Sequence, residues 1–262
     1  MIYLYFAIIV VVSYFIGSVN FARILAWKRR NQDITTKGSF NPGTMNMLRV
    51  YGFGIALWTL ILEFIKGGIP ALISGLVMEH FFPGMFYIAY FASGLSAVIG
   101  QIFPAIYKFK GGKGLGTCAG VFFFSPLWWV GIILFIVCFM ELYLINIPSV
   151  ATLTYITLLG AATTIYLTAF ETVKLYFVIP FGRTLSYWWV ALILMWCMIA
   201  IVYVAHRKNF YRLVHGKENK INFKKSLSDF FHKKDKNVEI LEDAEQKPEA
   251  EIIVEDTENK NK

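Results

Sequence analysis

Long apolar stretches alternate with short polar segments along most of the chain. Six of them approach the length of a membrane-spanning helix: Ile2–Trp27, Phe53–Met78, Phe86–Tyr107, Thr117–Tyr143, Ser149–Phe170 and Leu185–Ala205. The hydrocarbon core of a bilayer is about 30 Å thick, and a helix needs roughly 20 apolar residues to cross it. The pattern therefore predicts an all-α integral membrane protein.

The basic residues of the polar segments predict how the chain is oriented. Lysine and arginine gather in three places: residues 28–49, residues 108–113 and the segment that begins at Arg207. Because loops rich in these residues stay on the cytoplasmic side of a membrane, all three are expected there, with the N-terminus outside.

This orientation conflicts with a simple count of spans. From Lys113 to His206 the chain starts and ends on the cytoplasmic side, so it must cross the membrane an even number of times. Three apolar stretches lie between those residues. We expect Thr117–Tyr143 to be a broken helix, because Ser125-Pro126 interrupts it and breaks are tolerated where the freed backbone lines protein or a cavity. About seven transmembrane helices result, some of them short or broken.

The C-terminal region differs in composition from the membrane domain, residues 1–216. Apolar residues recur at helical spacing among lysines between Ile221 and Lys234, which is typical of a basic amphipathic helix on a membrane surface. We assign residues 217–236 to this interfacial segment. Residues 237–262 are mostly acidic and polar, so they are expected to be a disordered tail.

The overall composition narrows the class of protein. The chain is 57% hydrophobic and 16% charged, whereas a soluble domain carries about 25% charged residues. Its net charge of +8 suits loops that face an anionic leaflet or an anionic substrate. Nucleic acid is not expected as a partner, because the basic residues are scattered among the spans. The three cysteines lie in apolar stretches without a nearby histidine, so we expect no metal site.

The first basic loop, Lys37–Gly52, has the composition of an anion site. Asn41-Pro42-Gly43 predicts a tight turn. The short hydrogen-bonding side chains of the loop are Ser39, Asn41, Thr44 and Asn46. Arg49 follows at the start of a helix, where a guanidinium and backbone N–H groups together can bind phosphate. The alternative is a polar turn that only connects two spans.

The second basic loop, Lys108–Thr117, reads KFKGGKGLGT. Its lysines and glycines lead directly into an apolar helix, an arrangement in which backbone amides can approach a phosphate closely. It is not the nucleotide P-loop, because that motif ends in Gly-Lys-Ser/Thr and follows a strand. A flexible basic loop without a ligand is the alternative.

Charged and polar groups also occur within or beside the spans. His206, Arg207 and Asn209 follow the last span, where such side chains also serve as interfacial anchors. Glu63 and Lys66 lie about one helical turn apart within the second span. Because a charge at mid-membrane costs about 2.5 kcal/mol or more, these two are expected to pair with each other or to face a cavity.

Several segments together match one family of membrane enzymes in order and spacing. They are Tyr14–Ala22, Gly38–Gly43, Asn46–Arg49, Glu63–Gly67, Gly100–Pro104, Lys108–Gly114 and His206–Asn209, with Arg212, Leu213 and Gly216. Between Tyr14 and Lys220 the chain thus resembles the bacterial membrane acyl-phosphate:glycerol-3-phosphate acyltransferases (PlsY). The resemblance implies seven membrane helices in the bacterial plasma membrane, with the active-site loops on the cytoplasmic side.

The resemblance also implies a reaction and its residues. A fatty acyl group moves from acyl phosphate to the 1-hydroxyl of sn-glycerol 3-phosphate, giving lysophosphatidate and phosphate, with no cofactor and with neither acyl-CoA nor acyl-carrier protein as donor. The implied catalytic residues are Ser39, Arg49, Lys113 and His206. The implied substrate-binding residues are Asn41, Gly43, Asn46, Lys110, Gly111, Gly112, Gly114, Ser149 and Asn209. Of these, Ser39, Arg49 and His206 are expected at glycerol 3-phosphate, and Lys110 and Lys113, with the amides of Gly111 and Gly112, at acyl phosphate.

The sequence departs from the family pattern at a few of these segments. Phe40 replaces a glycine, Met45 stands where the family has threonine, Gln101 replaces a histidine, and residues 146–148 replace Arg-Tyr-Val. Two alternatives therefore stay open. One is a transporter or lipid-binding protein in which Glu63 and Lys66 line the path, and the other is a catalytically inactive relative.

Overall fold

The computed structural model describes residues 1–173, 188–218 and 220–232, and these ranges contain helices and turns but no strand. The chain forms two compact units, Met1–Ile221 and Asn222–Lys262. In the second unit, residues 223–232 are helical. The membrane domain expected to end at residue 216 is shorter than the first unit. The expected acidic tail, residues 237–262, lies outside the described residues, and the interfacial role of residues 217–236 stays a prediction.

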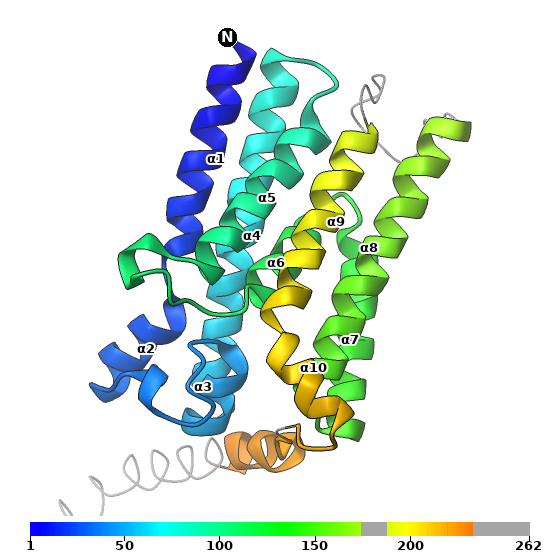
Figure 1. The fold of residues 1–262 in the computed structure, drawn as a ribbon. Helices are drawn as coiled ribbons and strands as arrows, with labels where there is room; N and C mark the ends of the chain where they lie inside the picture. The colour runs from blue at the N-terminus through cyan, green and yellow to red at the C-terminus, as the bar shows by residue number, and fades with distance from the viewer. Residues whose placement is uncertain (174–187, 219, 233–262) are drawn as a thin grey trace, which may run out of the picture. The chain divides into compact units, whose positions relative to one another are not determined.

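The first unit is a bundle of long and short helices (Figure 1). In chain order they are α1 (Ile2–Ser18), α2 (Phe21–Arg30), the 3₁₀ turn η1 (Ile34–Thr36), α3 (Thr44–Tyr51), α4 (Phe53–Phe81), α5 (Phe86–Ile102), the 3₁₀ turn η2 (Ala105–Tyr107), α6 (Leu115–Phe123), α7 (Trp128–Ile145), α8 (Pro148–Val173), α9 (Trp188–Ala205) and α10 (Arg207–Val214). The most buried long helix is α5, which packs against α1, α4, α6 and α9.

Six segments of the described chain are long and apolar enough to cross a membrane. They are Ile2–Arg30, Phe53–Phe81, Phe86–Tyr107, Trp128–Ile145, Pro148–Ala169 and Trp188–Ala205. The prediction of an all-α integral membrane protein is confirmed, with six long spans in the described chain and the short α6 beside them where about seven transmembrane helices were expected. The last span was expected to begin at Leu185, and residues 185–187 lie outside the described ranges.

The first predicted span is broken near its inner end. The sequence predicts one helix over Ile2–Trp27, but Val19 adopts an extended conformation between α1 and α2. Asn20 then caps α2, because its side-chain oxygen accepts a hydrogen bond from the backbone N–H of Arg23 at 3.0 Å. The break leaves the carbonyl of Val19 outside the helical hydrogen-bond pattern, and the ammonium of Lys66 donates to it at 2.8 Å.

The fourth predicted span is also broken, at the position that the sequence indicates. The short helix α6 ends at Phe123, and α7 begins at Trp128 after a turn in which the hydroxyl of Ser125 accepts from the backbone N–H of Leu127 at 3.2 Å. At about 1.5 Å per residue, the nine residues of α6 are too short to cross a bilayer.

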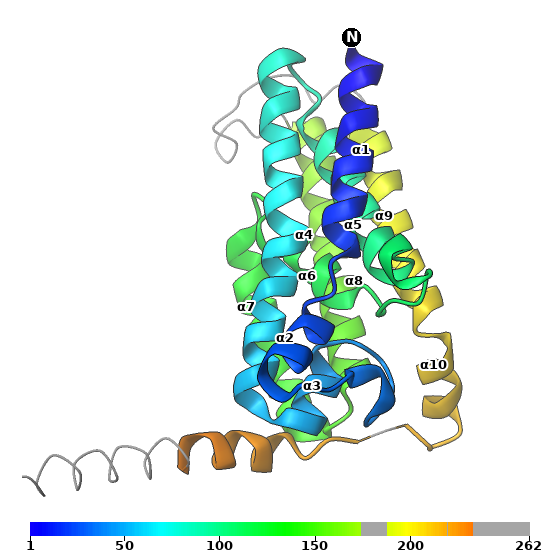
Figure 2. The same ribbon diagram turned by 90° about the vertical axis from the view of Figure 1, so that its left-hand side faces the viewer.

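The break resolves the conflict over the number of crossings. Side chains from the start of α6, the start of α8 and α10 meet through Lys113, Ser149 and Asn209. The chain therefore enters the bundle along the short α6 and returns to the same side along α7, and it then crosses along α8 and comes back along α9 (Figure 2). The three polar segments thus lie on one side of the bundle, as the parity argument requires.

Close packing of α4 against α6 fixes where the loop before α6 lies. A Cβ atom on Gly120 would lie 2.3 Å from the carbonyl oxygen of Phe64, and one on Gly67 would lie 2.0 Å from that of Thr117. Both distances are shorter than atoms tolerate, so only glycine permits this approach. The helix that follows the second basic loop is thereby held against the middle of α4.

Candidate active site

Three residues from distant parts of the sequence are in direct contact at one end of the bundle. The Nζ of Lys113 donates a hydrogen bond to Oδ1 of Asn209 at 2.5 Å, and Nδ2 of Asn209 donates to Oγ of Ser149 at 2.8 Å. Lys113 precedes α6, Ser149 lies in the first turn of α8, and Asn209 lies in α10. The fold therefore brings together three of the side chains that sequence reasoning selected.

A carboxylate that sequence reasoning missed completes this cluster. Oε1 of Glu218 accepts hydrogen bonds from Ser149 and Asn209, both at 2.6 Å, and its Oε2 accepts from Nε of Arg212 at 3.0 Å. One signal was available, because Glu218 is the only acidic residue in the basic stretch 206–225. We call this cluster the site network, and its members are Lys113, Ser149, Asn209, Arg212 and Glu218.

The surroundings of the site network are positively charged. Burial, together with the charges of Arg212 and Arg49, lowers the pKa of Lys113 to about 8 against the opposing effect of Glu218. Burial also lowers the pKa of Arg49, which lies within electrostatic reach of Glu218 and Arg212. Although burial raises the pKa of Glu218, its hydrogen bonds from Ser149, Asn209 and Arg212 lower it further and keep the group charged. Lys113, Arg49 and Arg212 together with the carboxylate of Glu218 leave two positive charges, enough to neutralise one phosphate dianion.

His206 is held as a neutral ring beside these charges. Its side chain is 5% exposed, and its Nδ1 lies 2.8 Å from the carbonyl oxygen of Val202. Because a carbonyl only accepts, Nδ1 carries the proton, which leaves Nε2 of the neutral ring as an acceptor. Burial lowers the pKa of His206 to about 4, with the charge of Lys113 acting in the same direction. His206 can thus accept a hydrogen bond from a hydroxyl group, but it holds a proton weakly.

Asn46 organises the first basic loop from within the protein. Its side chain is buried, its Oδ1 accepts from the backbone N–H of Ser39 at 2.8 Å, and its Nδ2 donates to the carbonyls of Lys37 and Ile34 at 2.9 and 3.2 Å. These bonds use both amide hydrogens and one of the two acceptor positions of Oδ1, so Asn46 positions Ser39 and has no donor left for a ligand. The hydroxyl of Ser39 makes no hydrogen bond within the described residues.

A second buried amide holds the other side of this loop. Nδ2 of Asn20 donates to the carbonyl of Pro42 at 3.1 Å, which fixes the turn that contains Asn41 and Gly43. Gly43 has the N-cap position of α3. Arg49, which the sequence predicted at the start of a helix, lies instead in the last turn of α3, because this short helix already begins at Thr44. Asn20 belongs to a segment that matches the family, but no role was expected for it from the sequence. The contact between Asn20 and Pro42 joins residues far apart in the chain, so it has no local sequence signature.

The second basic loop folds back tightly on the end of α5. The amides of Gly111 and Gly112 donate to the carbonyls of Ile102 and Gln101 at 3.2 and 3.0 Å. A Cβ on Gly111 would lie 2.1 Å from the Gln101 oxygen, so this position requires glycine. Both amides, which were expected to bind acyl phosphate, therefore have backbone partners. Gly114 then takes a left-handed conformation, with φ of 74°, and caps the start of α6.

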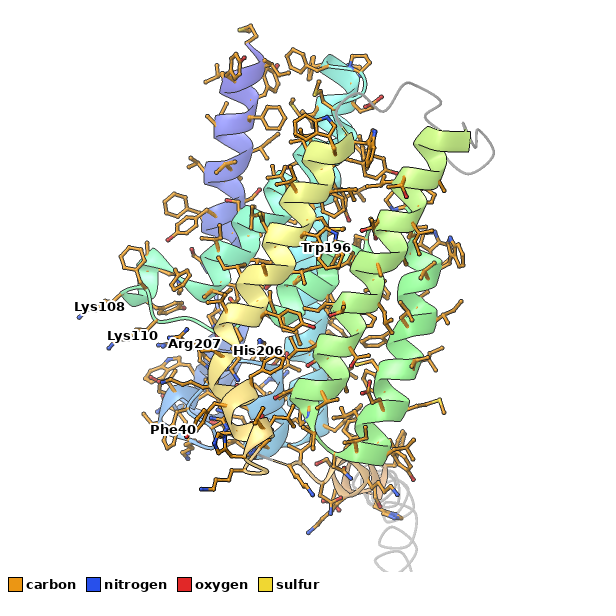
Figure 3. The ribbon with its side chains drawn as sticks, turned by 45° about the vertical axis from the view of Figure 1, so that its right-hand side comes forward. Phe40, Lys108, Lys110, Trp196, His206 and Arg207 are labelled. Carbon is orange, nitrogen blue, oxygen red and sulfur yellow. The ribbon has the colours of Figure 1, made fainter. Side chains whose placement is uncertain are left out.

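Lys113 and Lys110 lie in different surroundings although both belong to this loop. Lys113 is directed into the site network, whereas Lys110 is exposed and its side chain points away from the bundle, as does that of Lys108 (Figure 3). Figure 3 also shows His206 within the bundle rather than at the position of these two lysines. Of the two lysines expected at acyl phosphate, only Lys113 joins the other selected residues.

Glu63 and Lys66 belong to a separate group of buried polar side chains. Their side chains are 4% and 1% exposed, and Nζ of Lys66 lies 2.9 Å from Oε2 of Glu63. Oε1 of Gln101 accepts from Lys66 at 2.6 Å, and the hydroxyl of Thr117 donates to Glu63 at 2.8 Å. The expected pairing is confirmed. We call Glu63, Lys66, Gln101 and Thr117, with the carbonyl of Val19, the buried cluster.

The buried cluster accounts for one departure from the family pattern. Gln101 offers both an acceptor and a donor, since its Nε2 also lies 3.4 Å from Oε1 of Glu63. Its backbone carbonyl accepts from Gly112. Gln101 thereby links the ionic pair in α4 to the second basic loop, which neither local spacing nor composition could indicate.

The other departures have smaller structural effects. Phe40 adopts a left-handed conformation, with φ of 61°, but its side chain is 67% exposed and lies at the outside of the molecule (Figure 3). It does not fill the interior of the first basic loop. Asn146 takes the left-handed position at the end of α7, and Pro148 begins α8, each a favoured residue there. Nothing in the structure explains Met45.

An apolar cavity of about 320 Å³ opens beside the site network. Its lining includes Ser149 and Asn209, and it continues between α8, α9 and α10. The remaining lining residues are mostly apolar: Val150, Leu153, Thr154, Thr157, Leu158, Tyr203, Phe210 and Leu213. A hydrogen-bonding end and an apolar body suit a ligand that has a polar head and a hydrocarbon chain.

Comparisons with known proteins agree with this arrangement. The family described as glycerol-3-phosphate acyltransferase matches residues 7–216. Glycerol-3-phosphate acyltransferases of Mycoplasmopsis agalactiae and Finegoldia magna are 33% and 32% identical to the chain, over 81% and 84% of its length and 92% and 98% of theirs.

The fold also matches solved structures. PlsY (YgiH), an integral membrane glycerol 3-phosphate acyltransferase, has a TM-score of 0.65 in its glycerol 3-phosphate form, with 28% identity over 85% of this chain and 98% of that one. Its lysophosphatidic acid form gives the same TM-score at 25% identity. The chain therefore belongs to the glycerol-3-phosphate acyltransferase family of integral membrane enzymes.

Proposed function

We propose that this chain transfers a fatty acyl group from acyl phosphate to the 1-hydroxyl of sn-glycerol 3-phosphate. The hydroxyl oxygen bonds to the acyl carbon, the bond from that carbon to the phosphate oxygen breaks, and the hydroxyl proton ends on the released phosphate. The observation that carries the proposal is the chain of hydrogen bonds from Lys113 through Asn209 to Ser149, inside a cationic site and beside an apolar cavity.

The cations of the site have to hold two phosphate groups that repel each other. Lys113 lies at the start of α6, where the first N–H groups of a helix also favour anions, and we assign the acyl phosphate to it. Arg49 and Ser39 are assigned to the phosphate of glycerol 3-phosphate, with Asn46 holding Ser39 in place. Positioning and charge stabilisation supply most of the catalysis, because acyl phosphate is already activated.

His206 orients the attacking hydroxyl in this mechanism. Nε2 of its neutral ring accepts the hydrogen bond of the 1-hydroxyl and directs the oxygen lone pair toward the acyl carbon. With a pKa of about 4, the ring is too weak a base to keep the proton. A phosphate oxygen, whose second pKa is about 6, is the stronger base and takes it.

The acyl chain is assigned to the apolar cavity. The cavity starts at Ser149 and Asn209, so an acyl phosphate headed by Lys113 can place its hydrocarbon chain between α8, α9 and α10. The site is assigned to the cytoplasmic face and the N-terminus to the outside, because the basic loops lie together on one side of the bundle.

The two alternative functions lose most of the observations that suggested them. A transport path lined by Glu63 and Lys66 requires these side chains to face a cavity, but their partners are each other, Gln101, Thr117 and a backbone carbonyl. An inactive relative was suggested by several departures from the family pattern. The ring of Phe40 is exposed and Gln101 pairs with Lys66, so neither supports a lost site, while Met45 has no structural explanation.

Acyl transfer by the purified full chain in lipid vesicles tests the proposal. Palmitoyl phosphate and labelled glycerol 3-phosphate should give lysophosphatidate and phosphate in equal amounts, and palmitoyl-CoA should give neither. Lys113→Ala serves as the inactive control. The proposal fails if chromatographically monodisperse, folded protein forms no lysophosphatidate, or if it uses palmitoyl-CoA as readily as palmitoyl phosphate.

A further inference from the structure

The turn between α5 and the glycines of the second basic loop, residues 103–110, exposes apolar side chains. Phe103, Ile106 and Phe109 are 46%, 56% and 63% exposed. Figures 1 and 2 both show this turn projecting sideways from the bundle, level with the junction between α1 and α2. We call residues 103–110 the projecting turn.

Two side chains hold the projecting turn in this position. The hydroxyl of Tyr14 donates to the carbonyl of Phe103 at 2.8 Å and accepts from the backbone N–H of Ala105 at 3.1 Å. The guanidinium of Arg23 lies 4.6 Å from the centre of the Tyr107 ring, and its Nη2 donates to the carbonyl of Lys110 at 3.3 Å. The turn is thus tied to both α1 and α2, and its exposed side chains stay outside the bundle.

The backbone of the projecting turn is strained at two residues, and their side chains make no packing contacts within the described residues that would offset the strain. Lys108 and Phe109 have φ values of 52° and 59°, in the left-handed region that residues other than glycine rarely adopt. Such conformations persist where the surroundings enforce them, and they gather at functional positions. The ring of Phe109 is mostly exposed, so packing within the protein does not offset the strain.

The charges of the projecting turn also lack partners. Lys108 and Lys110 extend outward side by side (Figure 3), and their Nζ atoms make no hydrogen bond or ion pair with any described residue. The turn directly follows α5, and its residues 103–107 form the last part of the candidate span Phe86–Tyr107, with the two lysines just beyond the end of that span. Aromatic and apolar side chains next to lysines at the end of a span are typical of the membrane–water interface.

From these observations we propose that the projecting turn enters the headgroup region of an anionic leaflet. Phe103, Ile106 and Phe109 insert at the boundary with the acyl chains, while Lys108 and Lys110 bind the phosphate groups of anionic phospholipids. Burial of the Phe109 ring in lipid then offsets the strain of its backbone. This assigns Lys110 to a lipid phosphodiester, in place of the acyl phosphate that the sequence resemblance implied.

The proposed contact of the projecting turn with the leaflet also affects the rest of the second basic loop. The residue after Lys110 is Gly111, whose amide is bonded to the end of α5, and Lys113 follows two residues later. A turn anchored in the leaflet therefore holds the loop that carries Lys113 at a fixed depth, where a lipid-borne substrate arrives.

Spin-label accessibility tests the depth of the turn. Cys197, which is exposed, is replaced by serine, while Cys118 and Cys138 are buried and are kept. A nitroxide is attached at Phe109→Cys in the full chain in phosphatidylglycerol-containing vesicles. The matched control is Phe40→Cys, another exposed aromatic position with positive φ. The label at 109 should collide mainly with oxygen dissolved in lipid. Equal access of a water-soluble nickel reagent to positions 109 and 40 would overturn the proposal.

Lipid retention tests the assignment of the lysines. Native mass spectrometry of the full chain from mixed vesicles compares retained phosphatidylglycerol with phosphatidylcholine. Because one lysine near an anionic surface gives about a fivefold preference, Lys108→Gln/Lys110→Gln should reduce the preference by up to about 25-fold. The control pair Lys28→Gln/Arg29→Gln, at the exposed end of α2, should keep most of it. An equal loss in both pairs, or displacement of the lipid by excess glycerol 3-phosphate, would contradict the assignment.

Discussion

The buried cluster and the site network are built from similar side chains, but their charges are balanced differently. In the buried cluster one ammonium, on Lys66, meets one carboxylate, on Glu63, and both are almost completely enclosed. In the site network, the single carboxylate of Glu218 faces Lys113 and Arg212 and lies within electrostatic reach of Arg49. The first group is neutral, and the second retains an excess of positive charge.

This difference separates a structural role from a binding role. A charge inside a membrane protein is tolerated when its partner is permanent, because the surrounding low dielectric makes an unpaired charge costly. The excess charge of the site network is tolerated because the network lies where an anion can reach it. We expect changes in the buried cluster to affect folding, and changes in the site network to affect turnover.

The largest effect is expected for Glu63→Ala. The substitution leaves the ammonium of Lys66 buried without its anion, and breaking a buried pair in this way costs about 3–5 kcal/mol. The yield of monodisperse protein and its unfolding temperature in detergent should both fall, and activity should fall in proportion to the folded fraction.

A double variant supplies the control for that prediction. Glu63→Gln/Lys66→Met removes both charges at similar volume, so it should recover part of the stability that Glu63→Ala loses. The carbonyl of Val19 and Oε1 of Gln101 lose their donor in this variant, which limits the recovery. If the double variant is folded but inactive, the buried cluster has a direct role in turnover and the proposed separation is wrong.

Lys113→Ala should produce the opposite pattern. Lys113 is half-buried at the edge of the site, so its loss should leave the unfolding temperature nearly unchanged while kcat/KM falls at least about 100-fold, the effect of removing one group that stabilises developing charge. Steady-state rates with palmitoyl phosphate and glycerol 3-phosphate measure this change. Near-normal activity would remove Lys113 from the mechanism, and Lys113→Arg shows whether charge alone is sufficient.

The pH dependence of turnover tests the electrostatics of the site network. Lys113 binds an anion only when protonated, so kcat/KM should decline above about pH 8, where its pKa lies. Glu218 raises that pKa and Arg212 lowers it. The decline should therefore move to lower pH in Glu218→Gln and to higher pH in Arg212→Gln. His206 and Arg49 also lie near Lys113 and are unchanged in both variants. A decline that moves in the same direction in both would contradict the assignment to Lys113.

The contrast between the two clusters also shows what the sequence could predict. The pairing of Glu63 with Lys66 followed from helical spacing, because both residues lie on one face of α4. The break at Ser125 followed from the charge of the loops and the number of crossings. Hydropathy located the long spans, because each one is a local property of the chain, but it did not indicate the break at Val19 between α1 and α2.

The residues of the two clusters that come from distant segments of the chain could not be predicted in the same way. Gln101 and Thr117 reach Glu63 and Lys66 only after α5 and α6 pack against α4, and Glu218 reaches Ser149 only after α8 and α10 meet. Lys110 and Lys113 look alike in the sequence, but the tight fold of Gly111 on α5 directs only Lys113 into the site. Tertiary contacts decided these roles.

The smallest effect is expected at Phe40, in the first basic loop. Phe40→Gly removes the strain of a bulky residue at a φ of 61°, so the free energy of unfolding should rise by about 1 kcal/mol. Activity should stay the same, because the ring is exposed and outside the site. Phe40→Ala is the matched control, since it removes the ring but keeps a side chain in the left-handed region and should bring no stabilisation. Thermal unfolding and steady-state kinetics distinguish the two variants. If Phe40→Gly loses activity while Phe40→Ala keeps it, the strained backbone itself positions Ser39. The stability of this loop would then be coupled to turnover, a coupling that we do not expect elsewhere in the site.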